Sequence, residues 1–338
     1  MENERCQHVK RPRTDDGDIE QPQEATPNAL SQHPEFWFED GNVIIQAEST
    51  QFKVHCSVLS SQSEIFKDMF AIPQPSNASA ESASSPVIIL HDSLEDVQNI
   101  ISLLYDTMRI YNRQEKTPLS VIGSMLRLGR KYRFKNLVKE ALHCLTQDFP
   151  STFDLWDVLG GTKCIQFSGS TLFDVVYLAH EHSIKSILPC LYLMICSQFP
   201  LVQIRNGFNR PQSKHLLKTD EPLACLSGRE KLFRSVSQRT MAWIKRDIVP
   251  CEECTQRVKC ERRRRGLMNA VMDEDIHVVI NLVANSWNNN GLSKGLCPEC
   301  IKLAQSPYEE ERRKIWDELP GYFELKDEDF DAPWLVEP

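Results

Sequence analysis

Cysteines supply the strongest chemical signal in this sequence, which has 338 residues and 12 cysteines. Two C-x-x-C pairs, Cys251-Glu-Glu-Cys254 and Cys297-Pro-Glu-Cys300, stand near the C-terminus. Each pair can bind one metal ion through two thiolates, and two pairs complete the tetrahedral sulfur site that Zn²⁺ accepts. Cys260 is a fifth thiol that could replace one ligand. The alternative interpretation is a set of free surface thiols.

The spacing of the two pairs limits the kind of metal site they can form. Between Cys254 and Cys297 lie 42 residues, more than the roughly 15–20 residues of a compact zinc ribbon. Two predicted helices, at about 262–273 and 275–285, fill this gap and bring the pairs together. Four protein ligands leave no open coordination position. The sequence therefore predicts a structural zinc ion rather than a catalytic one.

A run of four arginines, Arg262, Arg263, Arg264 and Arg265, follows shortly after the first cysteine pair. Arginine side chains bind phosphates, so this run is a candidate contact for nucleic acid. However, no aromatic side chains interleave with the arginines to stack on bases. A solvated helix start, balanced by the acidic residues at 327–331, is the favoured interpretation.

No pattern in the sequence indicates catalysis. His55 and Cys56 are neighbours, but we identify no third residue that would orient a thiolate–imidazole pair. His180-Glu181-His182 places its histidines two residues apart, whereas a shared helical face for a metal needs four. The sequence therefore predicts a protein that is not an enzyme and that has no catalytic residue.

Composition and charge narrow the class of protein. The formal net charge is −8 and 41% of the residues are hydrophobic, values typical of a soluble globular chain rather than of a polyanion binder. The apolar stretch from Ile187 to Cys196 is too short for a membrane span of roughly 20 residues. No secretory signal is evident. We expect an intracellular protein, in the nucleus or the cytoplasm, whose cysteines stay reduced or bind metal.

The first 33 residues are polar and lack apolar periodicity, which predicts a disordered tail over residues 1–33. Within it, Lys10-Arg11-Pro12-Arg13 fits a nuclear-import pattern. A solvated run of charge is an equally favoured alternative.

The elements that must position the functional residues begin at Phe36 and continue to residue 148. Short apolar alternations and then helical spacing predict a small sheet flanked by helices, an α+β domain over 34–148. Ser63 fits the N-cap of a helix whose Phe66 and Phe70 share a buried face. Strands are expected at 36–38, 42–47, 51–54 and 87–90.

The second half of the chain reads as helical. Residues 128–141 and 178–191 align at an offset of 50 without a gap, and both place apolar residues around a helix–turn–helix bend. This repeat predicts a stacked helical extension over 149–250, with a polar connection at 200–228. A small Cys-rich zinc module with an acidic, aromatic tail then covers 251–338.

The strand from Phe52 to Val54 ends at His55, Leu59 stands in a short helix, and Ser63 and Phe66 open the next helix. In this order of residues, the N-terminal domain resembles the BTB/POZ family. The later helices and residues 313–320 look like those of fungal BTB-containing proteins. His55, Ser63 and Phe66 are the structural signature of this resemblance.

The resemblance implies a protein that works by binding proteins, including a second copy of itself. The apolar surface of the first strand and first helix is the implied interface, and its candidate residues are Phe36, Phe38, Val58 and Leu59. A substrate adaptor that recruits a cullin scaffold is an alternative. Family members with that role often carry an apolar-x-Glu motif, and Ser79-Ala80-Glu81 lacks its apolar anchor. A nuclear regulator that contacts nucleic acid through the arginine run is the other alternative.

Overall fold

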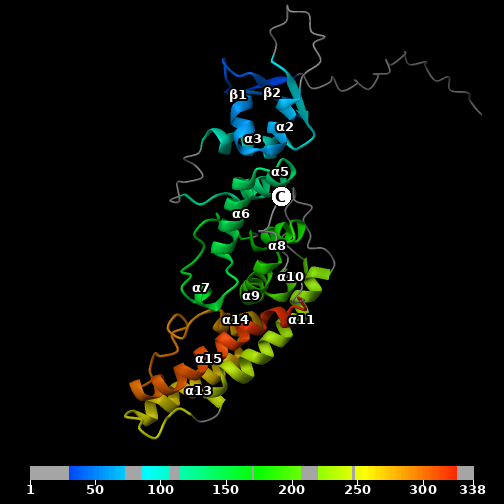
Figure 1. Cartoon of the computed structure of the whole chain (residues 1–338). Helices are drawn as coiled ribbons and strands as arrows, with labels where there is room; N and C mark the ends of the chain where they lie inside the picture. The colour runs from blue at the N-terminus through cyan, green and yellow to red at the C-terminus, as the bar shows by residue number, and fades with distance from the viewer. Residues whose placement is uncertain are drawn as a thin grey trace, which may run out of the picture.

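The chain forms a sheet-containing domain at one end and a long helical body at the other (Figure 1). The computed structural model describes residues 30–72, 85–106, 115–169, 171–206, 220–245 and 248–325. The predicted tail up to residue 29, with its basic cluster, and the acidic residues at 327–331 lie outside these ranges. Among the described helices, none has both the length and the apolar character needed to cross a membrane.

A small mixed sheet of four strands forms the first layer of the N-terminal domain. The strands are β1 (Ser31–Trp37), β2 (Val43–Ala47), β3 (Thr50–Val54) and β4 (Val87–Leu90). They lie in the order β1-β3-β2-β4, with β2 and β3 antiparallel and the two edge strands parallel to their neighbours. Every second residue of β2 is buried, as the alternation in the sequence predicted.

The first strand begins earlier than the sequence indicated. β1 starts at Ser31 rather than at Phe36, and Ser31 pairs with Thr50 of β3. The polar residues before Phe36 gave no apolar alternation, but the ring of His33 is buried between Phe36 and Phe52, with ring centroids 5.0 and 4.9 Å away. Stacking of the His33 imidazole therefore fixes residues 31–33 in β1, although the sequence assigned them to the disordered tail.

Helices cover the sheet in the order that the sequence predicted. They are α1 (Cys56–Gln62), α2 (Glu64–Ala71), α3 (Leu94–Tyr105), α5 (Leu119–Lys131) and α6 (Lys135–Asp148). The Ser63 hydroxyl accepts a hydrogen bond from the Phe66 N–H at 3.1 Å and donates one to the Tyr132 carbonyl at 2.5 Å. Ser63 is thus the predicted N-cap of α2, and it also ties α2 to the end of α5.

The predicted 50-residue repeat is present in three dimensions. After α5 and after α8 (Thr171–Glu181) the chain turns through a residue with positive φ, Arg133 at 54° and Ser183 at 54°. In each turn, the amide of the next residue donates a hydrogen bond back to the preceding helix. Phe134 donates to the Gly129 carbonyl at 2.8 Å, and Ile184 donates to the Ala179 carbonyl at 2.7 Å. Both helices therefore end in the same way, with one residue in the left-handed conformation. This ending gives a hydrogen-bond donor to a carbonyl of the last helical turn, which has no partner within the helix.

The helical body includes elements from both sides of the predicted border at residue 250. After α8 it contains η1 (Lys185–Ile187), α9 (Leu188–Gln198), α10 (Leu201–Asn206), α11 (Asp220–Ser235), η2 (Val236–Thr240), α12 (Ala242–Lys245), α13 (Arg257–Asp273), α14 (Ile276–Ala284) and α15 (Pro298–Tyr322). The short α7 (Phe153–Asp157) precedes them. Because α14 packs on α9 and α15 on α11, the extension and the Cys-rich region share one body.

Within the polar connection expected at 200–228, the described residues 201–206 and 220–228 are helical. α11 begins at Asp220, and its Cys225 and Leu232 are fully buried. A thiol in this position packs as a small apolar group, a role that the pattern of larger apolar residues did not reveal. Gly228 faces the Phe323 ring so closely that a Cβ atom there would lie 2.1 Å from it.

The residues expected to form an aromatic tail belong to α15. This helix continues through Pro307 and Pro320 to Tyr322. Proline normally ends a helix because it lacks an N–H, but the buried side chains of Tyr308, Trp316 and Leu319 hold these turns against the body.

Candidate functional site

The five C-terminal cysteines converge at one point of the helical body. The sulfur atoms of Cys254, Cys260, Cys297 and Cys300 all lie within 4.8 Å of one another, and three of the four residues are buried. The Cys254 and Cys297 sulfurs are 3.7 Å apart. Zinc–sulfur bonds of about 2.3 Å place the ligands of a tetrahedral site roughly 3.8 Å apart. The four thiols therefore fit a metal ion, and we name them the cysteine cluster.

Three separate elements bring the cluster together. Cys254 closes a turn in which its amide donates to the Cys251 carbonyl at 3.2 Å. Cys260 lies in the first turn of α13, and Cys297 is the N-cap residue of α15, which places Cys300 in that helix's first turn. The two intervening helices, predicted to close the 42-residue gap, are α13 and α14.

The cysteine cluster differs by one residue from the two C-x-x-C pairs that the sequence suggested as ligands. Cys260, considered an alternate ligand, belongs to the tight group, whereas Cys251 does not. The Cys251 sulfur lies 3.5 Å from that of Cys300, at the edge of the cluster. A helix start places Cys260 against α15, where its sulfur accepts a hydrogen bond from the Cys297 amide at 3.2 Å.

Hydrogen bonds prepare one of these thiols to bind a metal. Burial raises the pKa of Cys297, but hydrogen bonds from the backbone and thiol of Cys300 and from the Thr255 backbone outweigh it and lower the pKa to about 6. Burial raises the pKa of Cys260 and Cys300. Because the thiolate is the form that binds metal, the lowered pKa of Cys297 favours metal binding at neutral pH.

The arginine run beside the cluster does not form one basic face. Arg263 and Arg264 turn inward, and each donates to a backbone carbonyl, at 3.3 and 2.8 Å. Arg262 and Arg265 are exposed, and Arg265 forms an ion pair with Glu261 at 2.5 Å. Four consecutive residues of a helix point in four directions, so the run offers two exposed arginines rather than a phosphate-binding row.

The signature residues of the N-terminal domain, His55, Ser63 and Phe66, are buried or half-buried, and His55 contacts a tyrosine that the sequence did not reveal. The Tyr105 hydroxyl accepts a hydrogen bond from the His55 amide and lies 2.8 Å from its ring Nδ1. The other ring nitrogen, Nε2, lies 3.3 Å from the Asp40 carboxylate. His55 therefore joins the end of β3 to the end of α3, a contact between residues 50 positions apart. Phe66 packs against the Tyr132 ring at 5.1 Å.

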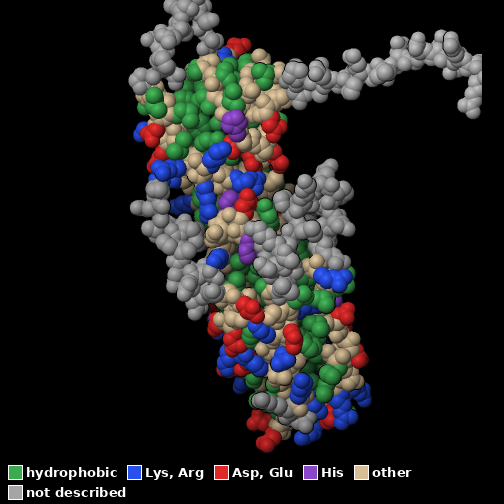
Figure 2. Space-filling model, turned by 90° about the vertical axis from the view of Figure 1, so that its right-hand side faces the viewer, with side chains coloured by type: hydrophobic (Ala, Val, Ile, Leu, Met, Phe, Trp, Pro, Cys, Tyr) green, Lys and Arg blue, Asp and Glu red, His purple; other side chains and the backbone are tan. Residues whose placement is uncertain are grey.

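Two of the four candidate interface residues lie inside the domain. Phe36 and Leu59 are 5% and 3% exposed and belong to the core of a single chain. Phe38 and Val58 are half-buried and reach the surface. Val58 and Leu59 are neighbours in α1 and point about 100° apart, so only Leu59 faces the core. Phe38 follows the end of β1, and its ring stacks on Tyr105 with the centroids 4.7 Å apart. Figure 2 shows hydrophobic side chains gathered over one face of this domain.

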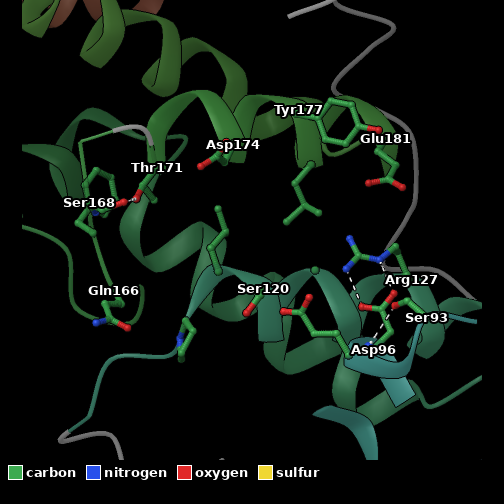
Figure 3. A pocket seen from close by; sticks show the side chains of 16 residues that line it. Ser93, Asp96, Ser120, Arg127, Gln166, Ser168, Thr171, Asp174, Tyr177 and Glu181 are labelled. Carbon is green, nitrogen blue, oxygen red and sulfur yellow. Dashed lines mark hydrogen bonds and ion pairs between the residues drawn. The ribbon is translucent and has the colours of Figure 1, made fainter. Parts of the chain in front are cut away.

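A groove of about 770 Å³ separates the N-terminal domain from the helical body (Figure 3). Asp96 and Arg127 form a bidentate ion pair on one wall, and Asp174, Tyr177 and Glu181 of α8 line the other. Carboxylates outnumber cations around the groove. It is the junction between the two parts of the chain, and its charged lining was not evident in the sequence because the walls come from separate segments, 93–127 and 166–181.

Comparison with known families identifies the N-terminal domain. The family model of the BTB/POZ domain matches residues 37–148. This part of the chain is therefore a BTB domain, a protein-interaction domain, and the resemblance inferred from the residues around His55 is confirmed. No curated protein matches the chain.

Proposed function

We propose that this protein acts by binding other proteins, and that its BTB domain joins it to a second copy or to a protein partner without chemical change. The observation that carries this proposal is the family match over 37–148. BTB domains mediate protein–protein interactions, including self-association. The half-buried apolar side chains of Phe38 and Val58 support an interface at β1 and α1, with Phe36 and Leu59 packed beneath them.

Sedimentation velocity of the full chain tests this interface. We expect Val58→Lys to lower the assembly state or to abolish capture of a protein partner, because a charge would be buried in an apolar contact. Leu155→Lys is the matched control, since Leu155 is exposed on α7, outside the BTB domain. A folded wild-type chain that is a strict monomer and captures no partner would count against the proposal.

The alternatives differ in their support. Contact with nucleic acid relies on an arginine run of which two members face inward. Recruitment of a cullin scaffold stays a prediction of the BTB family alone, and co-purification with a cullin would distinguish it. The nuclear or cytoplasmic location, and the likeness of the later helices to fungal proteins, also remain predictions.

We further propose that the cysteine cluster binds one structural Zn²⁺ through Cys254, Cys260, Cys297 and Cys300. The support is the convergence of four sulfur donors at tetrahedral spacing. A zinc ion bound there supplies a cross-link between α13, α15 and the preceding turn, with no position left for a substrate. Reduced thiols in this number fit an intracellular compartment.

Metal analysis of purified full-length variants tests the ligand set. We expect stoichiometric zinc in the wild type and in Cys251→Ser, and loss of zinc in Cys260→Ser and Cys297→Ser. If Cys251→Ser loses the metal and Cys260→Ser keeps it, the two C-x-x-C pairs are the ligands instead. Stoichiometric metal in a chain that lacks all five cysteines would refute the site.

A further inference from the structure

Cys251 is a thiol at the edge of the cysteine cluster that the proposed zinc site does not use. Its sulfur lies 3.5 Å from the sulfur of Cys300, and its amide donates to that same sulfur at 3.5 Å. The four thiols of the cluster lie within 4.8 Å of one another, and Cys251 is outside this group. Four thiolates complete the coordination of a tetrahedral zinc ion. A fifth thiol in contact with one of the ligands is therefore free for other chemistry.

Cys251 is more accessible than the thiol that it contacts. Cys251 is half-buried, whereas Cys300 is fully buried. The oxidation of a cysteine depends on its access to solvent and on its thiolate character. Cys254 is half-buried as well, but the electron pair of its sulfur is shared with the metal when zinc is bound. A dissolved oxidant therefore reacts first with Cys251.

The backbone at Cys251 leaves room for the two sulfurs to approach each other. A disulfide bond needs a shorter separation than the observed 3.5 Å, so one of the two cysteines must move. Cys300 is fixed in the first turn of α15. Cys251 lies before the turn that ends at Cys254, outside any helix or strand. The Cys251 segment can therefore move toward Cys300 without breaking a helix.

We propose that Cys251 is the redox-sensitive residue of the cluster, and that hydrogen peroxide joins Cys251 and Cys300 in a disulfide. This inference rests on the proposed zinc site, because it treats Cys300 as a ligand and Cys251 as a free thiol. Peroxide transfers one oxygen atom to the Cys251 sulfur, which gives a sulfenic acid and water. The Cys300 sulfur then uses the electron pair that it shared with the metal to form the S–S bond, and the sulfenic oxygen leaves as hydroxide. The two sulfurs together lose two electrons, and peroxide gains them.

Formation of this disulfide removes one of the four metal ligands. Structural zinc sites keep four protein ligands, so we expect the zinc ion to be released. The new bond keeps the segment before α13 attached to α15, whereas Cys260 on α13 loses the metal that connects it to α15. Oxidation therefore loosens α13, and reduction by a dithiol restores the four thiols of the site.

Treatment of the zinc-loaded full chain with hydrogen peroxide tests the redox pair. A chromogenic chelator follows zinc release, and mass spectrometry of peptides identifies the disulfide. We expect wild type to release zinc with formation of a Cys251–Cys300 disulfide, and dithiothreitol with added zinc to reverse both changes. Cys251→Ser should keep its zinc before treatment and release it at least tenfold more slowly. Cys56→Ser is the matched control, because Cys56 is a half-buried thiol of the BTB domain, and it should respond like wild type.

The outcomes separate the redox pair from the zinc site on which it rests. Release of zinc from Cys251→Ser at the wild-type rate would overturn the redox role of Cys251. A disulfide between two other cysteines of the cluster, such as Cys254 and Cys297, would overturn it as well. Absence of zinc from the untreated wild type, or its loss from untreated Cys251→Ser, would refute the proposed ligand set before any oxidant is added.

Discussion

At the scale of single residues, Asp96 shows how one side chain joins two helices of the BTB domain, α3 and α5. Its carboxylate accepts hydrogen bonds from Arg127, at 2.9 and 2.7 Å, and from the Ser124 hydroxyl at 2.6 Å. Burial raises the pKa of this carboxyl, but these hydrogen bonds outweigh it and hold the pKa below its usual value. The ionised form is therefore the one that stabilises the folded chain.

Asp96→Asn should destabilise the full chain by about 1–3 kcal/mol at pH 7, because it removes a charged hydrogen-bond acceptor from Arg127. A depressed carboxyl pKa gives stability that is complete above the unfolded value near 4 and is lost as pH falls through the folded value. Wild type should therefore lose stability below about pH 4 more steeply than Asp96→Asn does. Urea unfolding as a function of pH measures both effects.

Glu95→Gln is the control for that experiment, because Glu95 is the exposed neighbour on the same helix. It should leave the free energy of unfolding at pH 7 nearly unchanged. Equal pH slopes for wild type and Asp96→Asn would contradict the role assigned to the carboxylate.

At the scale of elements, α15 contacts several other helices of the helical body. Arg312, whose side chain is fully buried, donates to the Asp157 carboxylate at 2.8 Å and to the Val283 carbonyl at 3.0 Å, and it pairs with Glu309. The Trp316 ring stacks on Trp156 at 5.4 Å. One side chain thus joins α15 to α7 and α14.

Arg312→Met should destabilise the helical body by about 1–3 kcal/mol, because it removes the charged donor of three hydrogen bonds, while the partly exposed carboxylates of Asp157 and Glu309 regain water. Arg313→Met is the matched control. The neighbouring ion pair of Arg313 with Asp154 has side chains 52% and 77% exposed, so its loss should barely move the unfolding midpoint. Chemical unfolding followed by tryptophan fluorescence compares the two. Similar midpoints for both variants would show that Arg312 is dispensable.

At the scale of the whole molecule, the two parts are linked through a polar junction. Arg130 of the BTB domain donates to the His182 carbonyl at 2.8 Å. Buried Asp148, at the end of α6, accepts from the amides of Lys163 and Ile165 at 2.6 and 2.7 Å. The cysteine cluster lies elsewhere, within the helical body. The proposed metal should therefore affect one part of the molecule and spare the other.

Removal of the metal by a chelator should increase amide hydrogen exchange in 251–273 and 297–305, because the cross-link between α13 and α15 is lost. Exchange in β2 and β3 should stay the same, since the sheet shares no residue with the cluster. Hydrogen exchange with mass spectrometry on the full chain measures this, with Cys251→Ser expected to respond like wild type. A uniform change over the whole chain, or none near the cluster, would contradict the proposal.

The sequence by itself determined the local features of this protein. Ser63 as an N-cap, the paired bends at Arg133 and Ser183, and the BTB signature around His55 all depend on neighbouring residues and their spacing. Two C-x-x-C pairs were enough to predict a metal site, since the ligand chemistry is written in the residue types. Short-range periodicity also placed the helices between the pairs.

Only the tertiary structure decided which residues meet across long distances in the chain. It brought Cys260 into the cluster ahead of Cys251, turned Arg263 and Arg264 inward, and placed Tyr105 on His55. It also buried Arg312 between elements whose sequence positions are far apart. These outcomes follow from how helices pack, which sets the direction of each side chain and is not encoded by any single segment.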